Sequence, residues 1–442
     1  MPLQPALELG WRTPLDALDR ISDAPGALLL HGGAATGSGR FSYLSAFPAF
    51  VVAGDDRDSF ERLRTQFRTS ALQPGPARFQ AGYAGLFSYD LGAAFEPVDA
   101  LPDAIAAWPG LHLGWYEAVA CFDHDARRLT VCGKGSAAQR LAAAICAPRS
   151  KTVAGFHTEG LAPEWSQARY LRAVRLAREY IRAGDVFQVN LSHPYRGAVR
   201  GERAPFAYFR ALTEASPAAF SAYYRLSEDQ CVVTNSPERF LRVTADGDVQ
   251  TQPIKGTRPR GRTQAEDDAL AADLAGSAKD RAENLMIVDL MRNDLSRVCE
   301  PGSVRTPSLF SIESYANVHH LVSRVQGRLR EDQTVFELIA AAFPPGSITG
   351  APKPRAMELI AELEEEKRGP YCGALGWIGA DGAADLNVMI RTVGFARAGE
   401  GWRVEARSGG AIVIDSDPED ELAETRAKIA AIQSAFAQGA RS

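Results

Sequence analysis

Apolar residues recur at helical spacing along residues 166–184, where they mark one face of a predicted helix. These positions are Tyr170, Val174, Ala177 and Ile181. Because an α-helix turns once every 3.6 residues, side chains at this spacing face the same way. Ser166 precedes the pattern, and Gly184 stands where a C-terminal cap belongs. We predict a helix that starts near Ser166 and ends at Gly184.

Start signals place three more helices later in the chain. One begins near Ser277, with Asp280 three residues on, at the spacing of a capping box. A second begins near Pro352, because proline is favoured in the first turn of a helix. A third begins near Ser416, with Glu419 again at capping-box spacing.

Residues 186–192 alternate between apolar and polar side chains, which is the pattern of a strand. Phe187, Val189 and Leu191 would share one face. Gln188 and Asn190 would share the other face. This polar face either lines a site or is the solvent-exposed side of a half-exposed sheet. The pattern alone fits both.

The remaining elements predict the fold class. Further strand candidates lie at residues 231–236, 240–245, 372–380, 385–393 and 402–413. Residues 1–147 contain short strands, turns and some helix, punctuated by glycine and proline. Residues 148–165 have little periodicity and are interpreted as a connector to a second region at 166–435. Strands and helices mix without regular alternation, which predicts an α+β fold of antiparallel sheets with helices outside.

Composition and charge exclude some classes of function. The chain has 442 residues, of which 45% are hydrophobic and 23% charged, as in ordinary globular proteins. Its net charge is −5, from 49 basic and 54 acidic residues. A non-specific nucleic-acid binder normally has a basic excess, so we expect no nucleic-acid partner. Any anionic substrate must be held by local basic groups or by a metal ion.

The cysteines and the apolar runs indicate the compartment. The six cysteines are spread out without a CxxC pair, which disfavours a zinc site or disulfide scaffold and favours a reducing cytoplasm. The amino terminus has no basic segment followed by an apolar one, so we expect no signal peptide. No apolar run reaches the roughly 20 residues of a membrane helix, so we expect no membrane partner.

Lys255 lies in the stretch PIKGT, after a predicted strand and before Gly256. A lysine in such a loop is usually solvated. To act as a nucleophile it must lose its proton, and its reference pKa is about 10.4. Being half neutral at pH 7 requires a shift of about 3.4 units, or about 4.6 kcal/mol. Burial or a neighbouring cation supplies shifts of that size.

Three glutamates are candidates for acid–base or metal chemistry. Glu238 follows a strand, Glu283 lies on a predicted helix four residues after Lys279, and Glu424 lies on the last helix. Each also has an ordinary interpretation, such as a surface pair of Glu283 with Lys279. Glutamates that project from helices into one pocket would instead hold Mg²⁺, which prefers oxygen ligands.

Other polar residues are candidates for binding an anion. Arg391 in MIRT would face away from Ile390 on a strand and offers bidentate binding to a carboxylate. Gly409 and Gly410 would present backbone N–H groups. His320 in NVHHLVS is either a core residue or a catalyst, and its residue type does not decide. The loop at 346–353 lacks the spacing of a nucleotide-binding loop.

Together these stretches resemble the family of chorismate-utilising enzymes. They occur in the family's order and cover most of residues 165–430. The stretches are SPERF, PIKGT, SAKDRAENLMIVDLMRND, HHLVS, GSITGAPKPRAMELI, YCGALGW, NVMIRT and SGGAIVIDSDPEDELAET. A long ordered series is far more specific than any single motif. Residues 25–95 resemble the family's amino-terminal part more loosely.

The resemblance implies a fold and a site. The fold has two large, mainly antiparallel sheets packed face to face with helices outside. Glu283 and Glu424 would hold Mg²⁺, and Lys255, Glu238 and His320 would be catalytic. The implied contacts to chorismate are Gly256, Thr257, Thr349, Tyr371, Arg391, Gly409 and Gly410. Ala411 departs from the family, which usually has glycine there, so a methyl group crowds this backbone.

Two positions separate the branches of the family. Anthranilate-forming members typically carry alanine at the Lys255 position. Members that add water carry a lysine where this chain has Gln188. The combination here resembles the branch that forms 4-amino-4-deoxychorismate for para-aminobenzoate and folate biosynthesis. The implied mechanism is attack of Lys255 on ring carbon 2, with a proton from Glu238 for the leaving 4-hydroxyl, and then displacement of the lysine by ammonia.

The implied reaction requires a source of ammonia, and two other functions also fit the sequence. No cysteine stands in the GxCxG setting of a glutamine amidotransferase, so we expect a separate amidotransferase subunit as partner. The nearest alternative is the anthranilate-forming component of the family. A more distant one is a non-catalytic module that binds an aromatic metabolite.

Overall fold

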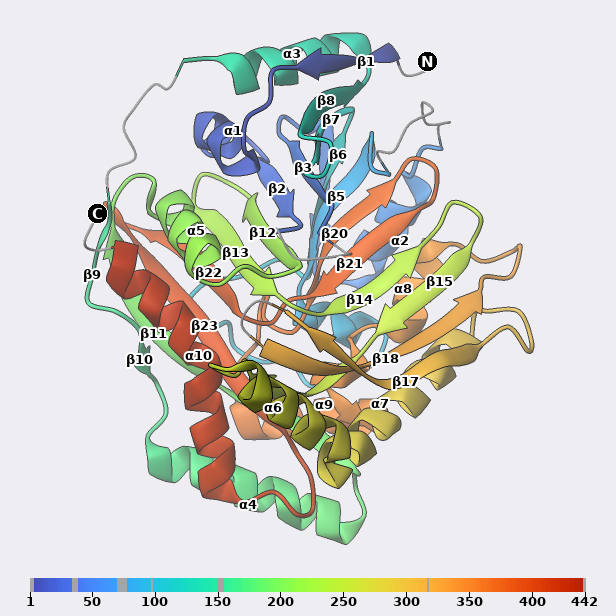
Figure 1. Cartoon of the computed structure of the whole chain (residues 1–442), viewed down its shortest axis with the longest axis vertical. Coiled ribbons are helices and arrows are strands. Elements are labelled where there is room, and N and C mark those ends of the chain that lie inside the picture. Colours follow the sequence, from blue (N-terminus) through green and yellow to red (C-terminus); the bar gives the residue numbers. More distant parts are fainter. Residues whose placement is uncertain are drawn as a thin grey trace.

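The computed structural model describes residues 4–33, 39–69, 78–96, 98–148, 155–315 and 318–439. Two large sheets face each other, and helices cover their outer sides (Figure 1). One hydrophobic cluster between them combines Tyr43 and Val232 of one sheet with Leu86 and Trp377 of the other. The predicted α+β fold with two face-to-face sheets is confirmed.

The strands of both sheets pair antiparallel throughout the part of the chain that the structure describes. Thirteen described strands form the first sheet: β1 (Gln4–Leu9), β2 (Leu28–His31), β3 (Phe41–Ser45), β7 (Ala118–Asp123), β8 (Arg128–Gly133), β9 (His157–Thr158), β10 (Ala162–Pro163), β11 (Gln188–Arg200), β12 (Phe220–Arg225), β13 (Gln230–Ser236), β19 (Gly350–Ala351), β22 (Thr392–Ala398) and β23 (Gly401–Ile412). Ten form the second: β4 (Phe50–Gly54), β5 (Gly82–Phe87), β6 (Leu111–Tyr116), β14 (Arg239–Val243), β15 (Asp248–Gln252), β16 (Ile254–Pro259), β17 (Arg305–Ser314), β18 (Val318–Arg328), β20 (Ala374–Gly379) and β21 (Ala384–Val388).

Helices surround the sheets and gather partly at one end. The α-helices are α1 (Pro14–Ile21), α2 (Arg57–Thr65), α3 (Gly135–Cys146), α4 (Gln167–Ala183), α5 (Ala204–Ala215), α6 (Gln264–Gly276), α7 (Ala278–Ser296), α8 (Val335–Ala342), α9 (Lys353–Glu364) and α10 (Pro418–Gly439). Two short 3-10 helices are η1 (Tyr89–Ala94) and η2 (Gly346–Ile348). Helix α4 lies at the lower end in Figure 1, and α10 runs down to it from the middle of the view. None of the described helices is long and apolar enough to cross a membrane.

Both sheets combine strands from the amino-terminal and carboxy-terminal parts of the chain. In the first sheet β2 pairs with β12, and in the second β5 pairs with β20. The chain after residue 155 adds β9 and β10 to the edge of β11. The predicted division of the chain at residues 148–165 stays a prediction. Each sheet contains strands from both sides of this division.

The cap signals located most of the predicted helix ends. The Ser166 side chain accepts a hydrogen bond from the Arg169 N–H at 3.2 Å, and Gly184 ends α4 at φ 90°. The Ser277 hydroxyl accepts from the Asp280 N–H at 3.2 Å and starts α7. These predictions are confirmed, as is the start of α9 after Pro352.

The start of α10 was predicted one residue too early. The Asp417 carboxylate accepts from the Glu419 N–H at 2.9 Å and so takes the cap position. The Ser416 hydroxyl instead donates to the Glu421 carboxylate at 2.7 Å. Both residue types suit a helix start, and the Ser416 hydroxyl is engaged with Glu421 while Asp417 caps the helix.

Residues 385–393 do not form one strand, so the predicted position of Arg391 on a strand was wrong. Strand β21 ends at Val388 in the second sheet, and β22 starts at Thr392 in the first. Arg391 lies between them with φ 51°, in the left-handed region. The chain crosses from one sheet to the other here, and a local apolar pattern carries no information about which sheet it joins.

The polar face of β11 is buried. Gln188 is 0% exposed and Asn190 6%, whereas Phe187 is 71% exposed. The alternative of a half-exposed sheet is therefore wrong for these polar positions. Strand β11 pairs with β23 along its whole length, with β19 at one end and with β9 and β10 at the other, so little of it is left uncovered.

Candidate active site

Lys255 is a partly buried lysine at the start of β16. Its ammonium Nζ donates to the Ser347 carbonyl oxygen at 2.9 Å. Burial lowers the pKa of Lys255, and the charge of Lys428 lowers it further, although Glu283 and Glu238 oppose the shift. Because burial prevails, the amine loses its proton more easily than a solvated lysine. The shift is in the direction that a nucleophilic lysine requires.

Glu238 lies between β13 and β14 and is 5% exposed. Burial raises its pKa, against a hydrogen bond with the Ser347 side chain and the nearby charge of Lys255. A raised pKa keeps a carboxyl group protonated at higher pH, as a proton donor must be. The structure thus places a candidate acid beside the candidate nucleophile.

Ser347 joins these two groups, and sequence reasoning missed it. Its carbonyl oxygen binds Lys255, and its side chain hydrogen-bonds with Glu238. The stretch GSITGA was recognised, but only Thr349 was selected from it. The Thr349 hydroxyl donates to the Pro345 carbonyl at 2.9 Å, so it closes its own loop. Ser347 could be recognised only from the position of η2 against β16, and local sequence does not encode that position.

Glu283 on α7 and Glu424 on α10 both interact with the charges of Lys255 and Lys279, although 141 residues separate them in sequence. The charge of Glu424 raises the pKa of Glu283, after the larger effect of burial. Burial opposes ionisation of Glu424 too, but Lys428, Lys279 and Lys255 together lower its pKa. Lys428 Nζ lies 2.5 Å from a Glu424 oxygen, and Lys279 Nζ lies 3.9 Å from a Glu283 oxygen.

This pair of carboxylates fits a magnesium site completed by a ligand. Within the described residues, no group of three or more metal-ligating side chains occurs. Mg²⁺ in enzymes is commonly held by one or two carboxylates and completes its shell with water and substrate oxygens. Two glutamates of perturbed pKa are therefore a suitable donor set for Mg²⁺ with an anionic substrate.

The glycine pair at 409–410 lies against α10. A side chain at Gly410 would come within 2.9 Å of a Glu421 carboxylate oxygen, so the Glu421 side chain would have to shift to admit it. The Gly409 carbonyl accepts a hydrogen bond from Lys428 Nζ at 3.0 Å. Lys428 and Glu421 were not selected from the sequence, because on α10 they are two of many charged residues. Ala411 lies opposite Asn190 in the pairing of β11 with β23.

His320 and Thr257 face each other between β18 and β16. The His320 Nδ1 and the Thr257 hydroxyl oxygen are 2.9 Å apart. Burial, with the charge of Arg391 adding to it, lowers the pKa of His320 to about 4. The imidazole is therefore neutral at pH 7, so it can orient a polar group without adding charge.

Arg391 is a candidate anion binder in its left-handed turn. Burial lowers its pKa, and no carboxylate in the described part of the chain pairs with its guanidinium. An unpaired, partly buried cation favours an incoming carboxylate. Tyr371 is buried, and burial raises its pKa well above the ordinary value, so its hydroxyl stays protonated. Gly256 has φ 82°, and a side chain there would lie 2.8 Å from Leu274.

Gln188 occupies the position where water-adding members of the family would carry a base. Its amide is fully buried, and neither polar atom has a hydrogen-bond partner among the described residues. A neutral amide does not abstract a proton from water. The structure places no cation at this position.

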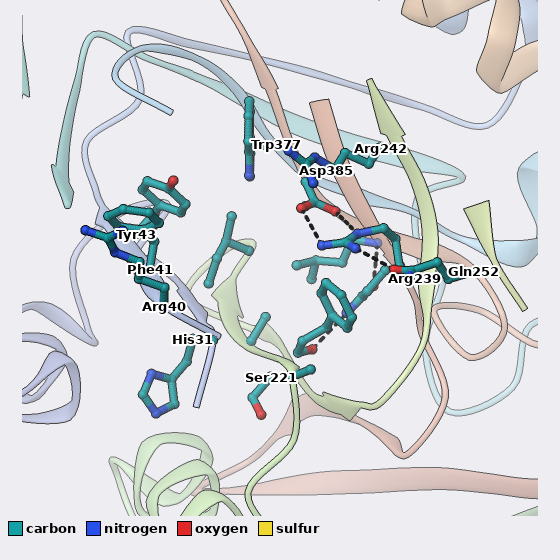
Figure 2. Close-up of a pocket in the computed structure, with 18 of the residues that line it drawn as sticks. His31, Arg40, Phe41, Tyr43, Ser221, Arg239, Arg242, Gln252, Trp377 and Asp385 are labelled. Carbon is teal, nitrogen blue, oxygen red and sulfur yellow. Dashed lines mark hydrogen bonds and ion pairs between the residues drawn. The ribbon is translucent and has the colours of Figure 1, made fainter. Parts of the chain in front are cut away.

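A separate cavity of about 730 Å³ opens between the two sheets (Figure 2). Glu313 and Asp385 line it together with Arg40, Arg78, Arg239, Arg242 and Arg324. Arg239 binds Asp385 at 2.9 Å in this cavity. None of the residues predicted for the site lines this cavity. The site around Lys255, Glu238, Glu283 and Glu424 (the lysine site) is therefore a different part of the molecule.

Comparison with known proteins agrees with this geometry. Residues 32–434 match the chorismate binding enzyme family. The chain belongs to this family. The family assignment confirms the resemblance inferred from the ordered stretches of sequence, and the matched region contains the whole lysine site.

Three relatives place the chain within the family. It is 39% identical to aminodeoxychorismate synthase component 1 of Klebsiella aerogenes, over 97% of this chain and 98% of the relative. It is 39% identical to anthranilate synthase component 1 of Saccharolobus solfataricus, over 82% of each chain. The structure of anthranilate synthase component I from Streptococcus pneumoniae TIGR4 superimposes with a TM-score of 0.78 at 30% identity, covering 89% of this chain and 92% of that one.

Proposed function

We propose that the chain is the chorismate-aminating component of an aminodeoxychorismate synthase. It converts chorismate and ammonia into 4-amino-4-deoxychorismate for para-aminobenzoate and folate biosynthesis. The observation that carries the proposal is the partly buried Lys255, with a lowered pKa, beside the buried Glu238, with a raised one; the Ser347 carbonyl holds the Lys255 amine. Full-length similarity to relatives named aminodeoxychorismate synthase component 1 supports it.

The reaction has two displacement steps. The neutral Lys255 amine attacks ring carbon 2 of chorismate, and the 4-hydroxyl leaves as water with the proton of Glu238. Ammonia then attacks carbon 4, and the lysine nitrogen leaves carbon 2 as a neutral amine. The new ammonium group returns its extra proton to the Glu238 carboxylate. Division of one difficult displacement into two easier ones is the advantage of covalent catalysis.

The other site residues bind and orient the substrate. Arg391 and the N–H groups at Gly409 and Gly410 hold carboxylates. Gly256, Thr257, Thr349 and Tyr371 complete the contacts, and neutral His320 orients the Thr257 hydroxyl. Glu283 and Glu424 hold Mg²⁺, which, when bound, neutralises substrate charge.

Ammonia comes from a glutamine amidotransferase subunit that associates with this chain. The relatives carry the word component in their names, which fits a two-part enzyme. We place the enzyme in the cytoplasm, and the lack of disulfides between the described cysteines is compatible with that location. Free ammonium at high concentration would replace the partner in vitro.

The test is product identity. The protein is incubated with chorismate, Mg²⁺ and ammonium, and products are separated by retention time and mass, with and without an added aminodeoxychorismate lyase. We expect 4-amino-4-deoxychorismate alone, and para-aminobenzoate once the lyase is present. Anthranilate, detected by its fluorescence without a lyase, would instead identify the chain as the anthranilate-forming component. Absence of any turnover would favour the binding module.

A further inference from the structure

Arg368 is a buried arginine that lies four residues beyond the end of α9. Its side chain is 1% exposed. One guanidinium nitrogen donates to the Ile348 carbonyl at 3.1 Å, and another donates to the Asn190 carbonyl at 2.7 Å. The same guanidinium binds both oxygens of Glu364, at 3.0 and 2.6 Å. One planar group therefore connects η2, strand β11 and helix α9.

The connection to η2 reaches the reacting groups. Ile348 follows Ser347, whose carbonyl holds the Lys255 amine and whose side chain binds Glu238. A second contact supports the same loop, because the Asn190 N–H donates to the Thr349 carbonyl at 2.8 Å. The position of the Ser347 carbonyl thus depends on how firmly η2 is attached to β11.

The fork geometry of arginine is essential to this contact. Glu364 neutralises the buried charge, so the remaining N–H groups of Arg368 are available to two carbonyls at once. Lysine carries the same charge, but it is a point donor that cannot span a carboxylate and two carbonyls in one plane. Replacement by lysine therefore keeps the charge and weakens the attachment of the loop, which then depends on the contact between Asn190 and Thr349.

We propose that Arg368 is a positioning residue that fixes η2 and thereby aims the Lys255 amine and the Glu238 carboxyl at the substrate. This inference rests on the proposed function of Lys255. Loss of the contact lowers kcat, because the reacting atoms lose their alignment. KM changes less than kcat, because Arg391 and the glycine pair do not touch Arg368, and of the assigned substrate contacts Thr349 lies in the loop that Arg368 holds.

Arg407 provides a matched control. Its side chain is also 1% exposed, and it also binds Glu364, at 3.0 Å. Its other donors reach Glu366 at 2.8 Å and the Ser192 hydroxyl at 3.4 Å, and its side chain has no described hydrogen bond to η2. Arg407→Lys therefore disturbs the same buried ion network by the same chemical change while leaving the loop attached.

The experiment compares Arg368→Lys and Arg407→Lys in the full chain. Steady-state turnover with ammonium gives kcat and KM, and thermal unfolding gives the loss of stability. The pH dependence of Lys255 labelling by an amine-acylating reagent, followed by mass spectrometry, reports on the amine without turnover. We expect a kcat lowered about 100-fold for Arg368→Lys, the scale of a misplacement near 1 Å, with a smaller change in KM. We also expect a changed labelling profile at Lys255.

Arg407→Lys should lower Tm by a similar amount and leave kcat and the labelling profile near the wild-type values. Equal losses of kcat in the two variants, or an unchanged Lys255 profile in Arg368→Lys, would overturn the proposal. If Arg368→Lys does not fold, the double variant Arg368→Gln with Glu364→Gln removes the fork without leaving an unpaired charge at either position. It should give the same loss of kcat. Wild-type protein that makes no aminodeoxychorismate contradicts the proposed function, while the labelling comparison still tests Arg368.

Discussion

The molecule contains two buried clusters of charge that behave in opposite ways. In the network of Glu364, Arg368 and Arg407, pairing prevails over burial: the pKa of Glu364 is lowered and that of Arg368 is raised. Around Lys255 and Glu238, burial prevails over pairing: the pKa of Lys255 is lowered and that of Glu238 is raised. The first cluster favours the charged forms of its groups, and the second shifts both of its groups toward their neutral forms.

The difference follows from the number of partners. Glu364 receives donors from two arginines and from the Ser192 backbone and hydroxyl. Lys255 donates to a single carbonyl, and no carboxylate among the described residues pairs with it directly. An incompletely paired charge in a desolvated site shifts its pKa toward the neutral form, which is typical of functional sites. The first cluster therefore has the properties of a structural ion network, and the second has those expected of a reactive site.

Removal of the nucleophile should have the largest effect on activity. Lys255→Ala leaves the fold intact and lowers aminodeoxychorismate formation by on the order of 10³-fold or more. The measurement is initial rate by mass-resolved product analysis. Lys134→Ala, which removes an exposed lysine paired with Glu117, serves as the control. A Lys255→Ala variant with the wild-type rate would remove the nucleophile from the mechanism.

Neutralising each buried glutamate should change stability in opposite directions. Glu364→Gln leaves two buried arginines short of a partner and costs about 3–5 kcal/mol. Glu238→Gln raises Tm at pH 7, because an ionised group whose folded pKa is raised destabilises the fold above its unfolded pKa of 4.5. Thermal unfolding from pH 4 to 8 measures both.

The pH series separates the two glutamates further. The lowered pKa of Glu364 gives stability above its unfolded value of 4.5, which is lost as pH falls through the folded pKa. In Glu364→Gln that acid-dependent loss should be smaller. Destabilisation by both substitutions would contradict the distinction between the two clusters.

Metal dependence of the activity tests whether Glu283 on α7 and Glu424 on α10 hold Mg²⁺. Chelation by EDTA should abolish turnover, and Mg²⁺ should restore it. Glu283→Gln should raise the Mg²⁺ concentration required by at least about 10–100-fold, which is the cost of losing even an outer partner of a metal. Asp289→Asn on the same helix, which breaks an exposed pair with Arg292, should change nothing. A Glu283→Gln variant with the wild-type Mg²⁺ requirement would exclude Glu283 as a ligand.

The smallest effect concerns the pH profile of Lys255. Burial lowers the pKa of Lys255, and the ammonium of Lys428 contributes to the shift. Lys428→Gln should therefore raise this pKa and move the rise of activity with pH toward higher pH. Arg426→Gln, on the same helix and hydrogen-bonded to Gln167, is the control. An unshifted limb in Lys428→Gln would show that Lys428 does not act on Lys255.

Local signals in the sequence predicted the helix caps and the fold class but not the crossings between sheets. The ends of α4 were correct because Ser166 and Gly184 act within one turn of the helix. The turn at Arg391 was missed because the apolar residues on both sides are buried in different sheets. A local apolar pattern predicts that a residue is buried. It does not predict which element the residue packs against.

The sequence by itself determined the family, through an ordered series of stretches, and within it the identities of Lys255, Glu238, Glu283 and Glu424. The tertiary structure alone decided that Ser347 joins the first two and that Lys428 acts on the site from α10. The reason is physical. A pKa depends on desolvation and on charges that fold into proximity from distant segments, whereas residue identity is fixed before folding.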